Sequence, residues 1–227
     1  MTTPAASPID LLERARAVHT RLLEVYGYPE WREPLPALDE LVSTILSQNT
    51  NDRNRDVAFF ALKGRFASWE AVRDGDLPAV IDAIRPAGLA NQKGPRIQAV
   101  LRQITAERGS LDLNFLREMP AAQVRDWLLR FNGVGLKTAS IVMQFSLGIP
   151  AFPVDTHIYR VSGRIGLRPE KMTADQAHTH LAGMFPPEEY GPAHLNLIRL
   201  GREVCHARKP DCPSCPVRSW CLYPDKT

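Results

Sequence analysis

Hydrophobic residues recur at intervals of three and four positions along most of this chain, the spacing typical of helices with one buried face. The segment 9–26 shows it clearly, with apolar side chains at Leu11, Leu12, Ala15, Val18, Leu22 and Val25. The same spacing predicts further helices over 38–48, 51–63, 77–84, 95–107, 121–130, 134–147, 154–165, 173–184 and 192–204. Glycine and proline separate these segments, and no stretch alternates over enough residues to predict a strand. The pattern therefore predicts an all-α protein.

The pattern changes between Gly148 and Pro153, where a helical region gives way to one that ends in a cysteine-rich segment. A chain of 227 residues can bury a sizeable core in one or two domains. We therefore expect a domain boundary in this stretch.

Composition narrows the class of protein only mildly. The formal net charge is +3 and the isoelectric point about 8.7, which permits nucleic-acid binding without requiring it. The longest uncharged run, 138–154, has glycine and proline inside it and is too short to span a bilayer. The N-terminus lacks the basic and apolar regions of a secretory signal. We expect a soluble cytoplasmic protein with no membrane partner and with reduced thiols.

The cysteines are confined to the last 23 residues of the chain, at Cys205, Cys212, Cys215 and Cys221. One compact loop with this C-x6-C-x2-C-x5-C spacing can bring four thiolates to one point, as a metal or an iron–sulfur cluster requires. The segment is rich in proline and poor in large apolar residues, so a bound metal centre would supply folding energy that burial does not.

Three interpretations of the cysteines compete. Disulfides are disfavoured in a cytoplasmic chain. Zinc sites usually pair two C-x2-C motifs, and this segment has one, between Cys212 and Cys215. A [4Fe–4S] cluster is bulkier and tolerates wider loops. The spacing favours the cluster over zinc and leaves both open.

A glycine-rich turn, Gly133-Val134-Gly135, joins two of the predicted helices. Glycine gives the backbone freedom at two positions and places no bulk between them. The turn opens directly into a helix, whose free N–H groups and positive dipole end suit a DNA phosphate. These features fit a helix-hairpin-helix, which grips DNA without reading its sequence, and they also fit an ordinary helix–helix turn.

Two charged residues flank the long uncharged run. Lys137 falls in the first turn of a predicted helix, where the helix dipole opposes a cation and favours the neutral, nucleophilic amine. Asp155 follows the run and could act as a base or stabilise a nearby cation. Each also has a plain alternative: Lys137 as a surface lysine, and Asp155 as the N-cap of the next helix.

Taken together, three motifs resemble the endonuclease III family of DNA glycosylases. They are Gly-Val-Gly-x-Lys-Thr-Ala at 133–139, Val-Asp-Thr-His at 154–157 and the cysteine spacing, in the family's order and at its distances. The resemblance covers roughly residues 9–223.

The resemblance implies a two-domain helix-hairpin-helix glycosylase fold. Residues 30–149 would form a six-helix barrel domain that holds the hairpin, at about 121–147. Residues 1–29 and 150–227 would form a second domain from the N-terminal helix, the C-terminal helices and a [4Fe–4S] cluster bound by the four cysteines. The implied partner is damaged double-stranded DNA, bound by a monomer that associates with the bacterial nucleoid while acting.

The family removes oxidised pyrimidines from duplex DNA and then cleaves the strand at the abasic site. By the resemblance, Lys137 attacks C1′ of a flipped-out nucleotide, and Asp155 helps to activate that amine and stabilises positive charge on the sugar. The resulting Schiff base leads to β-elimination. Relatives that lack the lysine stop at base removal, so Lys137 implies a bifunctional DNA glycosylase and AP lyase.

The resemblance also assigns contacts to DNA. Gln48 matches a helix-end glutamine, and Leu89 an apolar wedge, that fill the gap left by the flipped base; alone, each would be an ordinary structural residue. Gly133, Val134 and Gly135 would hold phosphate.

Basic residues fall where a duplex backbone would pass. Lys93 and Arg96 follow the wedge loop, and Arg208 and Lys209 lie between the first two cysteines, in a loop that resembles a phosphate-contacting segment of the family. The alternative is a solvated cluster of surface charge. Ala90, beside the wedge, departs from the aromatic residue that is often found there.

Two other functions stay open at this stage. A mismatch or adenine glycosylase would share the fold, but Glu40 does not match the catalytic glutamate of the adenine enzymes, which commonly lack the hairpin lysine. A module that only holds DNA would need neither Lys137 nor Asp155.

Overall fold

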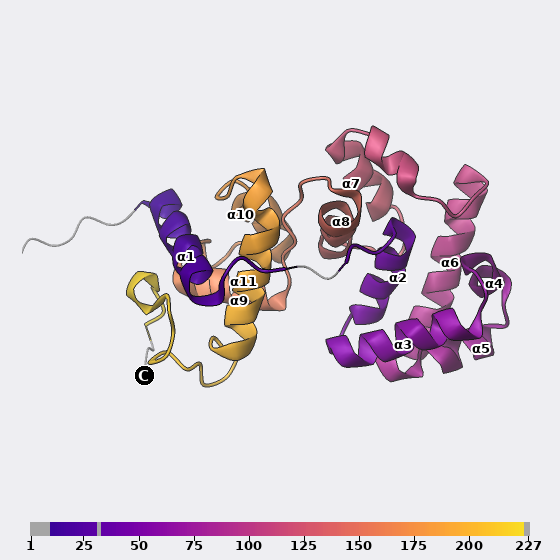
Figure 1. Ribbon diagram of the computed structural model, residues 1–227, viewed down its shortest axis with the longest axis horizontal. Coiled ribbons are helices and arrows are strands. Elements are labelled where there is room, and N and C mark those ends of the chain that lie inside the picture. Colours follow the sequence, from indigo (N-terminus) through magenta and orange to yellow (C-terminus); the bar gives the residue numbers. More distant parts are fainter. Residues whose placement is uncertain (1–9, 31–32, 225–227) are drawn as a thin grey trace, which may run out of the picture. The chain divides into compact units, whose positions relative to one another are not determined.

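The computed structural model describes residues 10–30 and 33–224, and all regular structure within them is helical (Figure 1). The all-α prediction is confirmed. The α-helices are α1 Leu11–Tyr26, α2 Ala37–Ser47, α3 Asp52–Arg65, α4 Trp69–Asp74, α5 Leu77–Ala83, α6 Ala90–Arg108, α7 Ala121–Leu129, α8 Leu136–Val142, α9 Thr156–Ile165, α10 Ala174–Ala182 and α11 Tyr190–Glu203. Short 3₁₀ turns are η1 Arg85–Ala87, η2 Asn114–Glu118, η4 Pro187–Glu189 and η5 Arg218–Trp220, and one π turn, η3 Met143–Leu147, extends α8. No described helix is long and apolar enough to cross a membrane.

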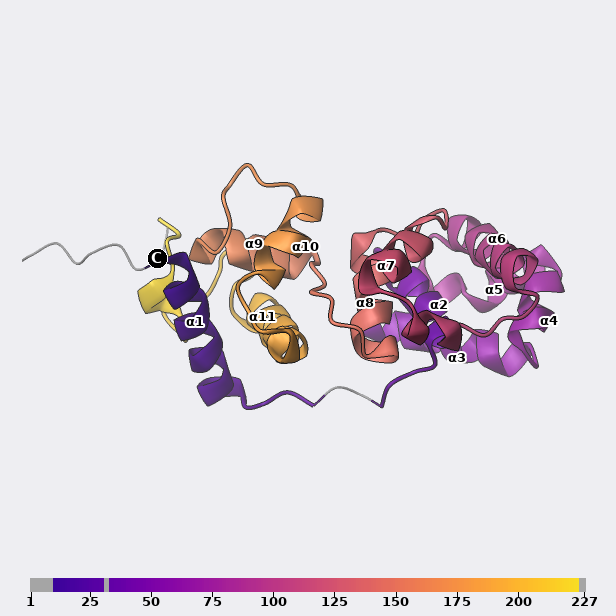
Figure 2. The same ribbon diagram turned by 90° about the horizontal axis from the view of Figure 1, so that it is seen from above.

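The chain divides into two compact units, visible in both views (Figures 1 and 2). We call residues 33–149 the hairpin unit, and residues 10–30 with 150–224 the cysteine unit. The cysteine unit joins segments from both ends of the chain, because α1 packs against α11.

The hairpin unit is built around α2. This helix packs against α3, α6 and α8 and lies among them in Figures 1 and 2. Nearly every one of its residues is buried, which is possible because α2 is apolar on several faces and carries a single buried carboxyl, Glu40. A helix enclosed in this way places its C-terminal end, Ser47 and Gln48, rigidly within the unit.

The cysteine unit has its own apolar core, formed by α1, α9, α10 and α11. Val18, Ile158 and Leu197 are buried in it, and three cysteines, Cys205, Cys215 and Cys221, pack against its edge. The cysteine segment therefore rests on a helical core although it contributes little apolar surface itself.

Two local predictions were wrong. The helix expected from Pro95 begins at Ala90, because Gly94 is not a turn residue: it lies so close to α5 that an added Cβ would stand 2.8 Å from Ile81. The short helix α4 was missed; Ser68 caps it by accepting a hydrogen bond from the Ala71 N–H at 3.2 Å. A helix of one and a half turns has too few positions to show a period.

Candidate functional site

The turn between α7 and α8 is a tight hairpin. The Val134 N–H donates to the Phe131 carbonyl at 3.0 Å, and the Phe131 side chain is buried. Gly133 has φ of +83°, a left-handed conformation that L side chains rarely adopt, and an added Cβ there would stand 2.2 Å from the Arg96 guanidinium. The positive φ therefore favours glycine at position 133, and a larger residue there would also have to displace the Arg96 side chain.

Gly135 is different from Gly133. Its φ is −96° and its ψ 179°, an extended conformation open to any residue, and nothing lies within 4 Å of an added Cβ. The prediction that both glycines are needed for backbone freedom was therefore wrong for Gly135, whose missing side chain leaves space beside the N-terminus of α8. The Val134 side chain is buried, so any ligand at this position would meet backbone.

Gln48 connects the end of α2 to the hairpin. Its Nε2 donates to the Gly133 carbonyl at 2.9 Å, and its Oε1 accepts a hydrogen bond from Arg96 Nη1 at 2.9 Å. Arg96 thus contacts both the hairpin glycine and the glutamine. Both ends of the Gln48 amide are engaged, so the side chain would have to exchange these partners to enter a DNA duplex.

Leu89 lies at the start of α6, preceded by Gly88. It has φ of +50° and ψ of 31°, a left-handed conformation that costs a branched apolar residue about 1–2 kcal/mol. The side chain is 47% exposed to solvent. A strained backbone that holds an apolar side chain in water is consistent with a wedge, whereas an ordinary structural leucine would be expected to be buried.

Lys93 does not lie where the sequence placed it. It was expected on the surface, facing a DNA backbone, but it is only 1% exposed. Its Nζ donates to the Leu46 carbonyl at 2.7 Å and to the Ala87 carbonyl at 2.8 Å. Burial, together with the smaller effect of the nearby positive charge of Arg96, lowers the pKa of Lys93 to about 8. A buried ammonium cannot contact phosphate, so the duplex-contact prediction for Lys93 was wrong.

Lys137 is the second residue of α8, within its first turn as predicted. The side chain is half-buried, and its Nζ stands 3.5 Å from Ser47 Oγ at the end of α2. Lys137 is therefore not the simple surface lysine of the alternative interpretation, because it faces the same helix end that carries Gln48.

Asp155 belongs to the cysteine unit and is the N-cap of α9. Its Oδ1 accepts a hydrogen bond from the Ile158 N–H at 2.7 Å. The capping alternative is therefore met, and a cap of this kind contributes about 1 kcal/mol to stability. The carboxylate remains half-exposed. Capping and a chemical role do not exclude each other, because a carboxylate has a second oxygen.

Two histidines hold the segment that leads into Asp155. His178 donates from Nδ1 to the Phe152 carbonyl at 3.0 Å, and His194 donates from Nδ1 to the Pro153 carbonyl at 2.9 Å. Both imidazoles are buried, and burial lowers the pKa of His178. Residues 152–154 are buried as well, so the backbone before Asp155 is fixed from several sides.

The four cysteines lie together. All four line a single pocket in the cysteine unit, with Leu200 and Val217 at its apolar wall. Burial, followed by the neighbouring thiols, raises the pKa of Cys215. Within the described ranges, no three or more His, Cys, Asp or Glu side chains are arranged as a site for one metal ion. A Cys₄ donor set around one apolar-walled pocket fits an iron–sulfur cluster, which is wider than a single ion.

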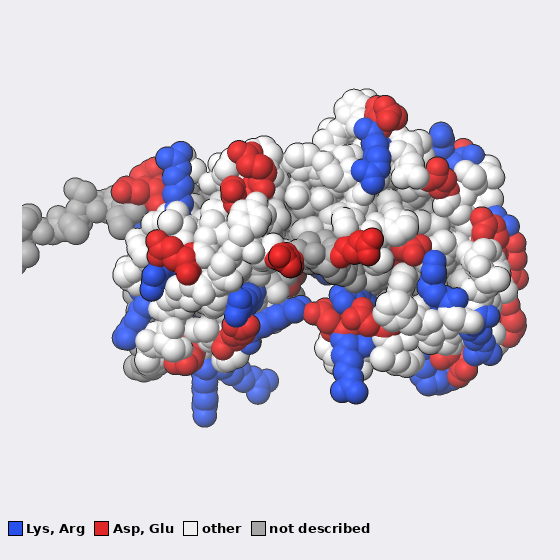
Figure 3. All heavy atoms as spheres, viewed as in Figure 1, with Lys and Arg blue, Asp and Glu red and all other residues white. Residues whose placement is uncertain are grey.

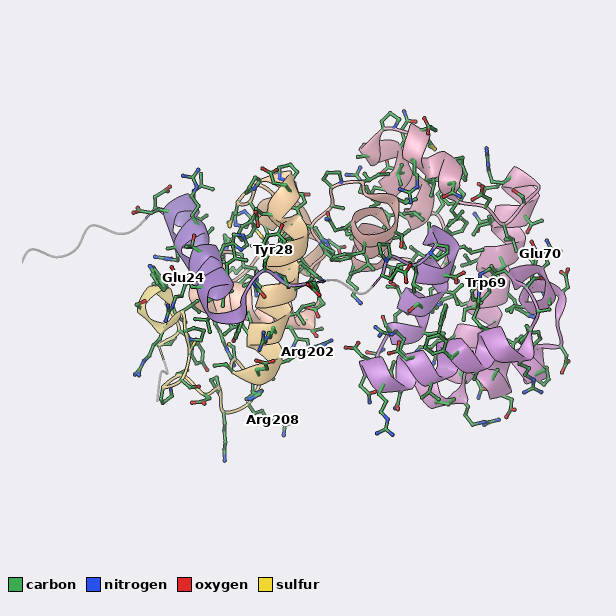
Figure 4. All side chains as sticks on the ribbon, in the orientation of Figure 1. Glu24, Tyr28, Trp69, Glu70, Arg202 and Arg208 are labelled. Carbon is green, nitrogen blue, oxygen red and sulfur yellow. The ribbon has the colours of Figure 1, made fainter. Side chains whose placement is uncertain are left out.

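Charged residues of both signs are mixed over the face drawn in Figure 3, as a net charge of +3 leads one to expect. In the cysteine unit, Arg208 and Lys209 are exposed, and Lys209 has a left-handed φ of +51°. Figure 4 shows Arg202 and Arg208 toward the same end of this unit. Arg164 organises their loop by donating to the carbonyls of His206, at 2.6 Å, and Ala207, at 3.0 Å.

Residues 42–187 match the HhH-GPD superfamily of base excision DNA repair proteins, and the chain belongs to that superfamily. It is a base excision repair DNA glycosylase of the endonuclease III type.

Comparison with individual relatives supports this assignment. The chain is 35% identical to the endonuclease III of Sulfolobus acidocaldarius, over 81% of this chain and 80% of that protein. It is 38% identical to the Arabidopsis thaliana protein At3g47830 over 76% of this chain, but spans only 59% of that protein's length. A solved structure described as a trapped endonuclease III–DNA covalent intermediate superposes with a TM-score of 0.80 and 25% identity, over 98% of this chain and 97% of that one.

Proposed function

We propose that this protein is a bifunctional DNA glycosylase and AP lyase that removes oxidised pyrimidines from duplex DNA, with Lys137 as its nucleophile. The observation that carries the proposal is the place of Lys137. The amine lies in the first turn of α8, two residues after Gly135, in a chain of a base excision repair family. The similar structure of a trapped covalent endonuclease III–DNA intermediate supports a covalent mechanism.

The lysine would act through its lone pair. Neutral Lys137 Nζ attacks C1′ of the damaged nucleotide, the bond from C1′ to the base breaks, and the base leaves with the bonding electrons and takes up a proton. Loss of the amine proton and opening of the sugar ring give a Schiff base between Nζ and C1′. This iminium withdraws electrons from C2′, so removal of a C2′ proton expels the 3′ phosphate and breaks the strand.

Asp155 would supply negative charge to the same reaction. Its Oδ1 is committed to the Ile158 N–H, and the carboxylate keeps a second oxygen. A negative group that is held rigidly stabilises a developing sugar cation without the cost of reorienting at the moment of reaction. The buried approach at residues 152–154 and the cap bond both hold Asp155 in place.

The hairpin unit would hold the duplex. Nothing lies within 4 Å of an added Cβ at Gly135, so a phosphate could approach there and accept hydrogen bonds from the N–H groups at the start of α8. Leu89 would enter the stack as the wedge, and Gln48 would follow after leaving its partners Arg96 and Gly133. On the cysteine unit, Arg208 and Lys209 would add phosphate contacts that carry no sequence information.

The cysteine pocket would hold a [4Fe–4S] cluster through Cys205, Cys212, Cys215 and Cys221. With four cysteine ligands no iron position is open to substrate, so the cluster's contribution is structural. It would tie the segment after α11 to the core of the cysteine unit and so support the loop that carries Arg208 and Lys209.

Trapping with borohydride tests the proposal. Reduction during turnover should convert the Schiff base into a stable protein–DNA adduct on duplexes that contain thymine glycol or 5-hydroxycytosine, with little or none on undamaged DNA. Lys137→Ala should abolish trapping and base release and leave DNA binding almost unchanged, because the hairpin grips through backbone. Lys171→Ala, which removes an exposed lysine of the cysteine unit, is the matched control.

Two results would count against the proposal. Undiminished trapping in Lys137→Ala would move the nucleophile to another amine. Base release by the wild-type protein from uracil duplexes alone would overturn the oxidised-pyrimidine assignment while leaving the glycosylase fold intact.

A further inference from the structure

Lys93 is a buried cation that the proposed chemistry does not use. Lysine is rarely enclosed in this way, because an ammonium loses its hydration on burial. The two carbonyls that it contacts explain why it is tolerated. Leu46 lies in the last turn of α2 and Ala87 ends η1, and carbonyls at the end of a helix lack the donor that a following turn would supply.

Each of those carbonyls lies two residues before a candidate DNA contact. Leu46 is followed by Ser47, which stands 3.5 Å from Lys137, and by Gln48, which bonds to the hairpin. Ala87 is followed by Gly88 and the exposed Leu89. One amine therefore joins the segment that carries the glutamine to the segment that carries the wedge.

The main chain of Lys93 strengthens this connection. Its own N–H donates to the Leu89 carbonyl at 2.9 Å and so starts α6, while its side chain turns back to Ala87. The same residue thus holds the strained Leu89 turn on two sides. Without the side-chain bonds, the left-handed conformation of Leu89 would lose a restraint that offsets its cost.

We propose that Lys93 is a positioning residue that sets the distance between Leu89 and Gln48, so that both side chains enter the gap left by a flipped-out base together. This proposal rests on the proposed function, because the two side chains need a fixed spacing only if the protein extrudes a base.

The bonding does not depend on charge. Burial brings the pKa of Lys93 to about 8, and a neutral amine still carries two N–H donors, one for each carbonyl. What the position requires is two donors at the end of a four-carbon chain. Methionine has a similar length and no donor, and glutamine has two donors on a shorter chain.

The test compares Lys93→Met with two controls. Leu101→Ala removes a fully buried side chain from the same helix and lowers stability without touching either turn, while Lys171→Met removes an exposed lysine from the other unit. Three quantities are measured for each: affinity for undamaged duplex, single-turnover base release, and the fluorescence of 2-aminopurine placed opposite a non-reactive tetrahydrofuran abasic analogue. The last reports insertion into the stack and requires no chemistry.

Lys93→Met should bind undamaged duplex within about threefold of wild type and release base about 100-fold more slowly, the loss expected when groups are misplaced by about 1 Å. Its 2-aminopurine signal at saturating protein should fall by more than half. Leu101→Ala should retain the signal despite a comparable loss of melting temperature. Equal signals in Lys93→Met and Leu101→Ala would overturn the proposal and reduce Lys93 to a fold-stabilising residue.

Two additions keep the result decisive. If Lys93→Met yields too little folded protein, Lys93→Gln can be measured in its place. It retains two donors on a shorter chain and should give a 2-aminopurine signal between those of wild type and Lys93→Met. In a double-mutant cycle, Leu89→Ala added to Lys93→Met should cost little beyond the larger single effect, because both act at one step, whereas full additivity would contradict the proposal. A wild-type protein that releases no base but shows the Lys93-dependent fluorescence would refute the proposed function and still support the positioning role.

Discussion

The two units hold their candidate catalytic residues in different ways. In the hairpin unit, Lys137 reaches Ser47 over a long 3.5 Å contact, while its surroundings are interlocked through Gln48 and Arg96. In the cysteine unit, Asp155 is itself bound at 2.7 Å to the backbone of the helix that it begins, and two histidines hold the chain before it. The Lys137 amine contacts a neighbouring side chain, whereas the Asp155 carboxylate is bonded to the main chain of its own helix.

This difference matches the proposed chemistry. A nucleophile has to move toward the sugar, form a bond and later leave, so its resting contacts have to be exchanged in each turnover. A carboxylate that stabilises developing charge works best when it is already in place. The difference also matters for experiment: substitutions at Asp155 mix chemistry with helix stability, because the same carboxylate caps α9.

The largest effect is expected from a substitution that disrupts the cysteine unit. Cys212→Ser should abolish cluster binding and remove much of the folding energy of the cysteine segment, so we expect little soluble protein with bound iron. In what is recovered, limited proteolysis should cut within residues 150–224 and spare residues 33–149, which are closed by their own contacts. Iron analysis and absorption near about 400 nm measure the cluster. One zinc and no iron in the wild-type protein would contradict the cluster assignment.

A matched pair of substitutions separates the two roles of Asp155. Asn is as good an N-cap as Asp, so Asp155→Asn should melt like wild type but react about 100-fold more slowly, which corresponds to about 2.7 kcal/mol of transition-state stabilisation. Asp155→Ala should lose the same rate and in addition about 1 kcal/mol of stability. Thermal melts and single-turnover rates provide both numbers. Full activity in Asp155→Asn would leave Asp155 as a cap and nothing more.

The smallest expected effect is a pH dependence in the hairpin unit. Unfolded Lys93 keeps its proton up to pH 10.5, whereas the folded protein releases it from a pKa of about 8. Between these values the unfolded state binds more protons, so the free energy of unfolding should rise with pH. Urea unfolding of wild type and Lys93→Met from pH 7.5 to 10 isolates this contribution, because other titrating groups are common to both. Parallel curves would show that Lys93 titrates normally.

The sequence predicted the helices and the grouping of the cysteines, because both depend on local spacing. It also placed Lys137 in the first turn of its helix. Glycine's conformational freedom was enough to predict the turn at Gly133. The contact between Gly133 and Arg96 was not predictable, because the two residues lie far apart in sequence and no periodicity relates them.

The missed features share a physical cause. Lys93 was expected on the surface because lysine is almost never buried without partners, and its partners are backbone carbonyls, which every residue carries and no sequence pattern distinguishes. The bond from Gln48 to the Gly133 carbonyl could not be predicted for the same reason, and its bond with the Arg96 side chain joins residues 48 positions apart. Tertiary hydrogen bonds of this kind could not be predicted because they leave no pattern in the sequence.

Leu89 has a thermodynamic consequence. Nearly half of its side chain, 47%, is hydrated in the unbound protein. If a duplex takes up this side chain, the water around it is released, and association acquires a negative heat-capacity change that phosphate contacts do not produce. Phosphate contacts instead release counterions and weaken as salt increases. Calorimetry at several temperatures would therefore measure the contribution of Leu89 to DNA binding, through the heat-capacity change. Titrations at several salt concentrations would measure the contribution of the cations, so the two parts of one binding free energy could be determined separately.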